Sequence, residues 1–274
     1  MLLPTTACRA LMTNDTPPDG FEWVPQPWGR VLRAPGLSEV ADHFFTTRQL
    51  RLRGPGVEAR EWALVAGAIG VAPSRLLRPR QVHGPAVAVV PRGTSFGTFS
   101  RGRRPAADAV VTDDPSCALA VQSADCVPLL MADSRTGAIA AVHAGWRGMA
   151  AGIIEAAIAA LRAHFGSRAA DLTAALGPSI GPCCYGVGED VVEAFSAAGH
   201  SPAWIDRWFL GGRNDGYRLD LRTAARDQLC GAGLQADRIH AADLCTAHDH
   251  TRFYSYRAEG SGTGRLAAVI RARG

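Results

Sequence analysis

The chain has 274 residues, of which 47% are hydrophobic and 20% are charged, and this balance is typical of a protein with a folded core rather than of a disordered chain. Its net charge of +4 is small and its basic residues are scattered, so the sequence predicts no nucleic-acid partner. All 29 basic residues are arginine, which excludes a Schiff-base lysine, a pyridoxal-phosphate lysine and a Walker-type phosphate loop.

The cysteines and the apolar runs indicate the cellular compartment in which the protein is expected. Seven cysteines are an odd number, and they lack the close spacing of a secreted disulfide scaffold, so a reducing compartment is expected. The chain shows no charged segment ahead of a long apolar run, and no stretch approaches the ~20 apolar residues that span a bilayer. The sequence therefore predicts a cytoplasmic protein with no membrane partner.

The first part of the chain is rich in proline. Residues 1–38 hold six of the 17 prolines and show no sustained periodicity, which predicts an irregular N-terminal extension outside a single domain formed by residues 39–274. Within that domain, residues 43–48 are typical of a short strand, and residues 58–69 have apolar positions at helical spacing before Gly70 ends the pattern.

The middle of the chain alternates short apolar runs with turn residues. Strands are predicted for residues 86–90, 108–112, 118–122, 127–131, 138–142 and 172–176, and the four runs between 108 and 142 are expected to be neighbours in one sheet. The loop 91–106 is expected to be exposed. An alanine-rich helix over 148–164 has one apolar face to cover the sheet.

The last third completes the pattern. A helix is predicted over 189–197, a packed insertion or lid over 201–216, and a helix over 221–230 with Asp220 as its N-cap. Closing strands are predicted for 239–242, 252–256 and 266–270. Together these elements predict an α/β fold, a single domain of mixed β-sheets flanked by helices.

The chemistry of the sequence concentrates between residues 122 and 149. Cys126 and His143 each lie at the end of an apolar run, so pairing of the two strands would bring a thiol and an imidazole together. A thiolate and an imidazole are ligands that zinc or copper prefers over magnesium. Spacing leaves the third ligand open, with six candidates: His83, Cys183, Cys184, Cys245, His248 and His250.

The same two side chains permit a different chemistry. Cys126 can act as a nucleophile with His143 as its base, and backbone amides near residues 145–148 can stabilise an oxyanion. A thiolate that binds zinc is a poor nucleophile, so metal content decides between the two hypotheses.

An anion site is also predicted. Arg147 lies in Gly-Trp-Arg-Gly at the start of a helix, and Arg48 and Arg257 are candidates to converge with it on a phosphate or carboxylate. The alternative is a structural turn in which Trp146 fills the core and Arg147 pairs with Asp125 or Asp133.

Several motifs occur together in one order along the chain: Gln81-Val-His-Gly84, Asp108-Ala-Val-Val-Thr-Asp113, Ser123-Ala-Asp-Cys-Val-Pro128, His143-Ala-Gly-Trp-Arg-Gly148, Gly177-Pro-Ser-Ile-Gly-Pro182 and Gly264-Arg265. This combination resembles the YfiH-type laccase-domain family, whose members are named polyphenol oxidases or purine nucleoside phosphorylases. The resemblance runs from about His43 to the C-terminus and implies that residues 39–274 form a YfiH-like catalytic domain.

The resemblance implies a ligand set and an activity. His83, Cys126 and His143 match the family's metal ligands, with zinc expected and copper as the alternative. Proteins of this kind cleave adenosine, inosine and methylthioadenosine with phosphate and deaminate adenosine, so a small-molecule nucleoside and phosphate are the expected partners of a monomer or small homo-oligomer. In deamination, zinc would activate the water that attacks the purine ring.

Roles for the remaining side chains follow from the same resemblance. Arg48 and Arg147 are expected to hold phosphate, and Asp125 is the candidate for proton transfer or, alternatively, a hydrogen-bond partner of His83 or His143. The residues expected to line the substrate site are Cys184, Tyr185, Asp220 and Arg257.

Three other functions remain open. A Cys126/His143 hydrolase, an amidase that edits peptidoglycan precursors, is one, and a metal-binding module without catalysis is another. A single-copper polyphenol oxidase is the third, because eight histidines with one His-x-His pair are too few for a four-copper oxidase.

Overall fold

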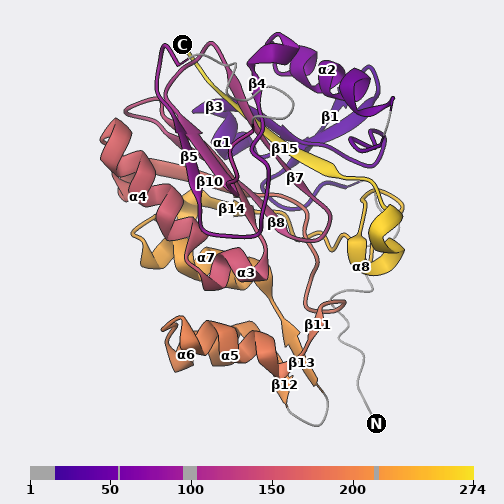
Figure 1. Ribbon diagram of the computed structural model, residues 1–274, viewed down its shortest axis with the longest axis vertical. Coiled ribbons are helices and arrows are strands. Elements are labelled where there is room, and N and C mark those ends of the chain that lie inside the picture. The colour runs from indigo at the N-terminus through magenta and orange to yellow at the C-terminus, as the bar shows by residue number, and fades with distance from the viewer. Residues whose placement is uncertain (1–15, 55, 95–103, 213–215) are drawn as a thin grey trace.

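Two six-stranded β-sheets form the body of the protein, and helices cover their outer faces (Figure 1). The computed structural model describes residues 16–54, 56–94, 104–212 and 216–274. The strands of the first sheet lie in the order β1 (Glu22–Gln26), β2 (Gly29–Arg33), β3 (Ala41–Phe45), β15 (Leu266–Ala272), β7 (Ala118–Ser123) and β4 (Leu76–Leu77). Only β7 and β4 pair in parallel in this sheet, and its other pairs are antiparallel.

The second sheet is also mixed. Its strands lie in the order β14 (Ile239–Ala241), β10 (Leu172–Leu176), β8 (Val127–Asp133), β9 (Ile139–Ala144), β6 (Ala109–Thr112) and β5 (Val87–Val90). The two outermost pairs, β14 with β10 and β5 with β6, are parallel, and the pairs between them are antiparallel. These mixed sheets confirm the predicted fold class.

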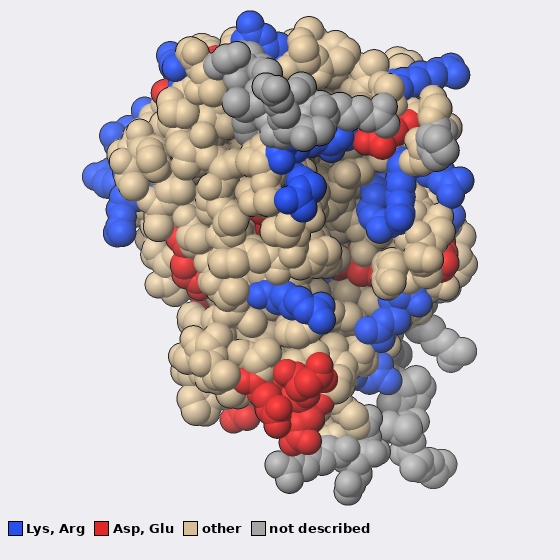
Figure 2. All heavy atoms as spheres, in the orientation of Figure 1, with Lys and Arg blue, Asp and Glu red and all other residues tan. Residues whose placement is uncertain are grey.

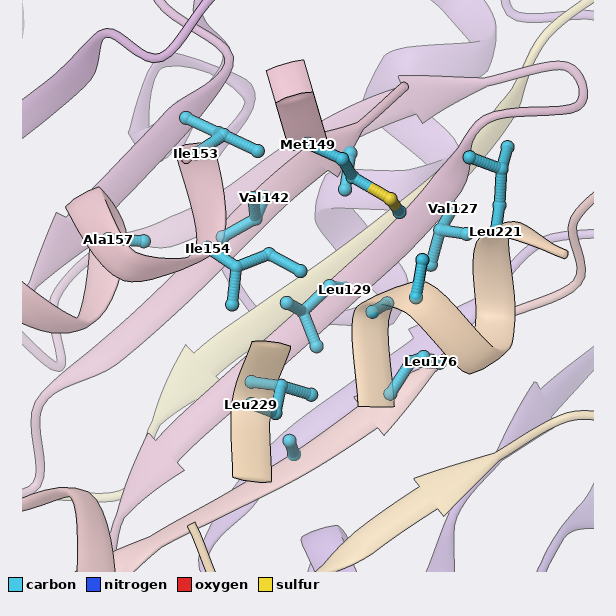
Figure 3. Packing of buried hydrophobic residues seen from close by; sticks show 14 of the residues in the cluster. Val127, Leu129, Val142, Met149, Ile153, Ile154, Ala157, Leu176, Leu221 and Leu229 are labelled. Carbon is cyan, nitrogen blue, oxygen red and sulfur yellow. The ribbon is translucent and has the colours of Figure 1, made fainter. Parts of the chain in front are cut away.

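The buried side chains divide into three layers because successive residues of a strand point to opposite faces. In β8, Leu129 packs against helices while Leu130 packs between the two sheets. Helix α2 (Glu58–Ala68) covers the first sheet. Helices α4 (Ile153–Phe165) and α7 (Leu221–Gly231) cover the second, where Ile154 and Leu229 meet Leu129 (Figure 3).

A smaller lobe lies next to the second sheet (Figure 1). It holds the three-stranded sheet β11 (Gly186–Val187), β13 (Gly216–Leu219) and β12 (Phe209–Gly212), with helices α5 (Glu189–Ala197) and α6 (Pro202–Trp208). Trp208 and Phe195 are buried in it and meet edge to face, and the half-buried Trp204 lies beside Trp208. The predicted packed insertion over 201–216 is thus part of this lobe, and Figure 2 shows a patch of acidic side chains on it.

Three short helices and four 3-10 turns complete the described chain. The helices are α1 (Pro35–Ser38), α3 (Trp146–Ala150) and α8 (Tyr256–Glu259), and the 3-10 turns are Pro73–Arg75, Ala169–Asp171, Ala236–Arg238 and Gly260–Gly262. No helix among the described residues is both long and apolar enough to cross a membrane.

The prediction of an irregular segment over residues 1–38 is wrong for residues 22–38. This part forms the antiparallel hairpin β1–β2 and helix α1, and the hairpin extends the first sheet. Pro25 is compatible with a strand here because β1 is the edge strand of the sheet, where one side of the backbone needs no partner strand. Residues 1–15 lie outside the described residues, as do residues 95–103 of the predicted exposed loop.

Three other predictions are corrected. The single helix over 148–164 is two helices, α3 and α4, because Gly152 between them has a left-handed backbone with φ of +78°. The run 252–256 is not a strand, since Ser255 caps the start of α8 by accepting from the Ala258 amide. The four runs from 108 to 142 do not share one sheet, because β7 belongs to the first sheet and β6, β8 and β9 to the second. Helix α7 does begin after Asp220, as predicted.

Candidate metal centre

The candidate site lies where the chain crosses between the two sheets. Residues 78–86 link β4 of the first sheet to β5 of the second and carry His83, and residues 124–126 link β7 to β8 and carry Cys126. In the β8–β9 ladder Pro128 faces His143 and Val127 faces Ala144, so Cys126, the residue before β8, lies beside the end of β9. The predicted pairing of these two segments is confirmed.

His83, Cys126 and His143 converge. Their potential ligand atoms all lie within 4.8 Å of one another, and the two imidazole rings meet edge to face with centroids 4.8 Å apart. His143 is buried, Cys126 half-buried and His83 exposed, so the group opens toward solvent on one side. Among the other five candidates for the third ligand, the three cysteines form a separate group.

One carboxylate positions both histidines. Asp108 Oδ1 lies 2.8 Å from His143 Nδ1, and Asp108 Oδ2 accepts hydrogen bonds from the backbone amides of Val82 and Gly84 at 3.0 and 2.8 Å. These two amides flank His83, whose backbone is left-handed with φ of +60°. A proton on Nδ1 leaves Nε2 of His143 with its lone pair for a metal. Asp108 was missed at the level of sequence, although it opens the Asp-Ala-Val-Val-Thr motif.

The thiol and the buried imidazole stabilise each other as a charged pair. Burial alone would raise the pKa of Cys126, but the charge and hydrogen bonds of His143 and His83 lower it. Burial likewise opposes the protonated form of His143, but Cys126 and Asp108 raise the pKa of this imidazole. The site therefore favours a thiolate at neutral pH, which is the form that binds soft metal ions.

The space around the thiol also suits a metal. A Cβ added at Gly145 would lie 2.9 Å from Cys126 Sγ and 3.4 Å from His83 Cδ2, so the glycine leaves room that any other residue would fill. A set of two imidazoles and one thiolate is typical of zinc or copper sites, and three protein ligands leave a position open for a substrate or water. The residues therefore fit such an ion.

Asp125 makes carboxylate hydrogen bonds other than the predicted alternative contact with His83 or His143. Its carboxylate accepts from the Thr246 hydroxyl at 2.6 Å and from the Arg257 amide at 2.7 Å, and its backbone has φ of +95°. The histidine partner is Asp108 instead. Asp125 thereby joins the β7–β8 crossing to the start of α8.

Four predicted site residues, Cys126, Arg257, Asp125 and Arg147, lie within electrostatic range of Tyr185. Burial and the charge of Cys126 raise the pKa of Tyr185 to about 12, against the opposing charges of Arg257 and Arg147. The Arg257 guanidinium lies 5.1 Å from the centre of the Tyr185 ring. Arg147 stacks on Trp146 at 4.2 Å, and among the described contacts it forms no ion pair with Asp125 or Asp133, so that predicted alternative is not observed.

Arg265 joins this group although it had no predicted role. Burial lowers its pKa, while the negative charges of Cys126 and Asp125 act in the opposite direction, so the guanidinium lies within range of the thiolate. Its position after Gly264 in a recognised motif was the available signal.

Other predicted site residues are engaged elsewhere. Arg48 pairs with Glu259 at 3.1 Å and stacks on Tyr254 at 4.8 Å, so it holds helix α8 in place. Asp220 caps α7 by accepting from the Arg222 and Thr223 amides and from the Thr223 hydroxyl. Cys184 precedes Tyr185 and belongs to the second cysteine group. Direct substrate contact by these three residues stays a prediction.

Two packed mixed sheets with a candidate His–Cys–His metal centre define an α/β protein with arginines near that centre. The chain belongs to the family described as multi-copper polyphenol oxidoreductase laccase, whose model matches residues 56–273. The predicted family is thereby confirmed.

Relatives and solved structures agree on the family. A purine nucleoside phosphorylase of Bacteroides thetaiotaomicron is 32% identical over 88% of this chain and 96% of its own length. Adenosine deaminase RL5, from an unknown prokaryotic organism, is 35% identical over 75% of this chain and 78% of its own. The crystal structure of Bacillus licheniformis hypothetical protein YfiH superposes with a TM-score of 0.83 at 26% identity, covering 93% of this chain and 100% of that one.

Proposed function

We propose that this protein is a metal-dependent purine nucleoside phosphorylase that acts on adenosine, inosine and methylthioadenosine and also deaminates adenosine. The observation that carries the proposal is the convergence of His83, Cys126 and His143 within 4.8 Å, supported by one carboxylate. The names of the relatives support the two activities. We propose zinc as the ion, with copper as the alternative, and when bound it would supply Lewis-acid chemistry.

The residues around the centre provide what phosphorolysis needs. Arg147, Arg257 and Arg265 bring positive charge to the side of Tyr185 and Cys126, which suits a phosphate dianion. In the reaction a phosphate oxygen bonds to the anomeric carbon of the ribose while the glycosidic C–N bond breaks and the purine leaves. The raised pKa of Tyr185 keeps its phenol neutral, so it can donate a hydrogen bond to an anion.

Asp125 is our candidate for proton transfer to or from the purine. Its two oxygens already accept hydrogen bonds from Thr246 and from the Arg257 amide, so it also fixes the start of α8. Arg48 supports the same helix through Glu259, and a contribution of Arg48 to phosphate binding is part of this proposal.

The direct test uses purified protein loaded with zinc. Adenosine with phosphate should give adenine and ribose 1-phosphate, and adenosine without phosphate should give inosine and ammonia. Cys126→Ser should lose at least about 10³-fold in both rates, because a metal contributes several kcal/mol to the transition state. Cys230→Ser, which changes an exposed cysteine of α7, is the matched control. If the zinc-loaded protein forms no ribose 1-phosphate, the phosphorylase proposal fails.

A second function is favoured by one specific arrangement. Asp108, His143 and Cys126 follow one another as acid, imidazole and thiol, which is the order of a nucleophilic triad. This arrangement supports a thiol hydrolase, for which we propose peptidoglycan precursors as the substrate. Metal-free protein should then cleave an amide substrate, and alkylation of Cys126 should abolish the cleavage, whereas the phosphorylase requires metal.

We also propose that the protein works in the cytoplasm as a monomer or small homo-oligomer. The absence of a helix that could cross a membrane, within the described residues, is compatible with that compartment. Sedimentation of the purified protein would measure the oligomeric state.

A further inference from the structure

A second group of metal-binding side chains lies apart from the first. The Sγ atoms of Cys183, Cys184 and Cys245 are all within 4.8 Å of one another, and the structure gives all three residues as thiols. Cys183 and Cys184 follow the turn after β10, and Cys245 is brought to this turn by a bridge between its own backbone and that of Ser179. Cys245 is buried and the other two are half-buried, so an ion can reach the group from solvent.

A hydrogen-bond donor and a guanidinium lie beside this group. The backbone amide of Gly181 donates a hydrogen bond to Cys245 Sγ at 3.2 Å. A Cβ at Gly181 would lie 3.1 Å from Arg222 Nη2, 3.4 Å from Cys183 Sγ and 3.4 Å from Cys245 Cβ. The guanidinium and two of the cysteines therefore lie on the same side of this glycine. Asp243 and the Ala242 carbonyl hold Arg222 in place at 2.8 and 3.2 Å. The guanidinium offsets part of the charge that three thiolates would carry.

We propose that Cys183, Cys184 and Cys245 form a second metal site that binds one monovalent copper ion. Three thiolates and no oxygen or imidazole ligand make a soft site, as monovalent copper prefers. Zinc can also take three protein ligands and keep an open position, as at the first centre, so it is the softness of the three sulfur ligands, and not their number, that favours monovalent copper here. Binding replaces the thiol protons by the metal and changes no oxidation state.

The second site is coupled to the first through Asp125. Thr246 follows Cys245 and donates to Asp125, and the amide of Ile180, in the turn before Cys183, donates to the Asp125 carbonyl at 2.8 Å. An ion that fixes the three cysteines therefore also fixes the two segments that hold Asp125, the neighbour of Cys126. The proposal does not depend on the activity assigned to the first centre.

Copper stoichiometry tests the proposal. The full-length protein, freed of metal and kept anaerobic, is titrated with monovalent copper against a chromophoric chelator. We expect Cys126→Ser, which disables the first centre, to retain one tightly bound equivalent, and we expect the added pair Cys183→Ser and Cys245→Ser to remove it. Cys230→Ser in place of that pair is the control. Retention of the same equivalent without the two thiols, or no retained copper in Cys126→Ser, would overturn the proposal.

A measurement on the unmodified chain guards against variants that fail to fold. With one equivalent of copper bound in the presence of saturating zinc, alkylation followed by peptide mass mapping should show protection of Cys183, Cys184 and Cys245, while the exposed Cys230 is labelled at the same rate as without copper. Labelling of the three cysteines at an unchanged rate would also refute the site.

Discussion

The two cysteine-containing groups differ in what holds their side chains. His83, Cys126 and His143 combine nitrogen and sulfur ligands, and the buried carboxylate of Asp108 positions both histidines. The all-thiol group instead has a backbone amide at Cys245 and the guanidinium of Arg222 nearby. The first arrangement fixes which ring nitrogen of His143 is free to bind an ion. The second only supplies positive charge that offsets the charge of the thiolates.

This difference follows from the two kinds of ligand. An imidazole can bind through either ring nitrogen, so it needs a partner that fixes its tautomer and orientation, as Asp108 does for His143. A thiolate has no tautomer to fix, so the three-cysteine group needs only proximity and positive charge. We therefore expect the first centre to be sensitive to the loss of a single hydrogen-bonding partner, and the second to be much less so.

The largest effect, a loss of folding stability at low pH, is expected at a buried histidine whose hydrogen bonds in the described part of the chain are to backbone groups and not to a carboxylate. His43 Nε2 accepts from the Ala34 amide and its Nδ1 lies against the Ala41 carbonyl, so the neutral ring is required, and burial lowers its pKa to about 4. Since the unfolded pKa is about 6.5, the unfolded chain gains the proton first as pH falls. Stability is full above pH 6.5 and about 3 kcal/mol of it should be lost on going to pH 4.

Denaturant unfolding at pH 7 and pH 4 measures this loss. His43→Gln retains an acceptor for the Ala34 amide without a titrating ring, so its free energy of unfolding should fall less than that of the wild type over the same interval. Exposed His164→Gln is the control and should follow the wild type. Parallel losses in His43→Gln and wild type would mean that a missing carboxylate does not distinguish His43 from His143.

The next largest effect, a loss of zinc affinity, is expected when Asp108 is replaced. In Asp108→Asn, an amide oxygen that still accepts from Val82 and Gly84 places its NH2 group against Nδ1 of His143, so the imidazole moves its proton to Nε2 and loses the lone pair that faces the centre. Zinc affinity should fall about 10- to 100-fold. Competition with a chromophoric chelator measures it.

Asp114→Asn provides the matched control, because Asp114 is a buried aspartate beyond the other end of β6 that accepts from the Ser116 amide. Monovalent copper binding by the three cysteines should be unchanged in both variants. An unaltered zinc affinity in Asp108→Asn would remove the distinction between the two groups.

Much of the fold follows from patterns that the sequence displays directly. The apolar runs of β6 to β10 and the helical spacing of α2 and α5 are read from local residues, and the structure has them within a few positions. Local residues do not predict that β7 lies in a different sheet from β6, β8 and β9. That assignment depends on which face each strand presents to its partner sheet. Gly152 and Ser255 interrupt patterns that otherwise continue across them.

The centre was predictable in part. Cys126 and His143 follow from strand ends and the β8–β9 pairing. His83 required a resemblance, because it lies 43 positions before Cys126 and no local pattern selects it among the other candidates. Asp108 and Arg265 were not identified, since an aspartate before a strand and an arginine after a glycine are common. Their roles appear only when the crossing segments meet.

The smallest effects, on metal affinity, are expected at two glycines that lie beside the two groups. Neither Gly145 nor Gly181 has a left-handed backbone, so alanine tests space alone. In Gly145→Ala the Cβ would lie 2.9 Å from Cys126 Sγ and must displace the ligand itself, which should weaken zinc about tenfold. In Gly181→Ala the nearest atom, Arg222 Nη2 at 3.1 Å, belongs to no ligand, and the nearest ligand sulfur, Cys183 Sγ, is at 3.4 Å, so copper should weaken only about threefold.

Each alanine should leave the other metal unaffected, and Gly67→Ala, which meets no atom within 4 Å in α2, should leave both unaffected. The same two metal titrations measure all three variants. A larger effect at Gly181 than at Gly145 would reverse the comparison, because it would mean that the all-thiol group is held by geometry as strict as that which Asp108 imposes on the histidines. The order of the two effects thus tests whether the support differs, independently of whether either metal takes part in turnover.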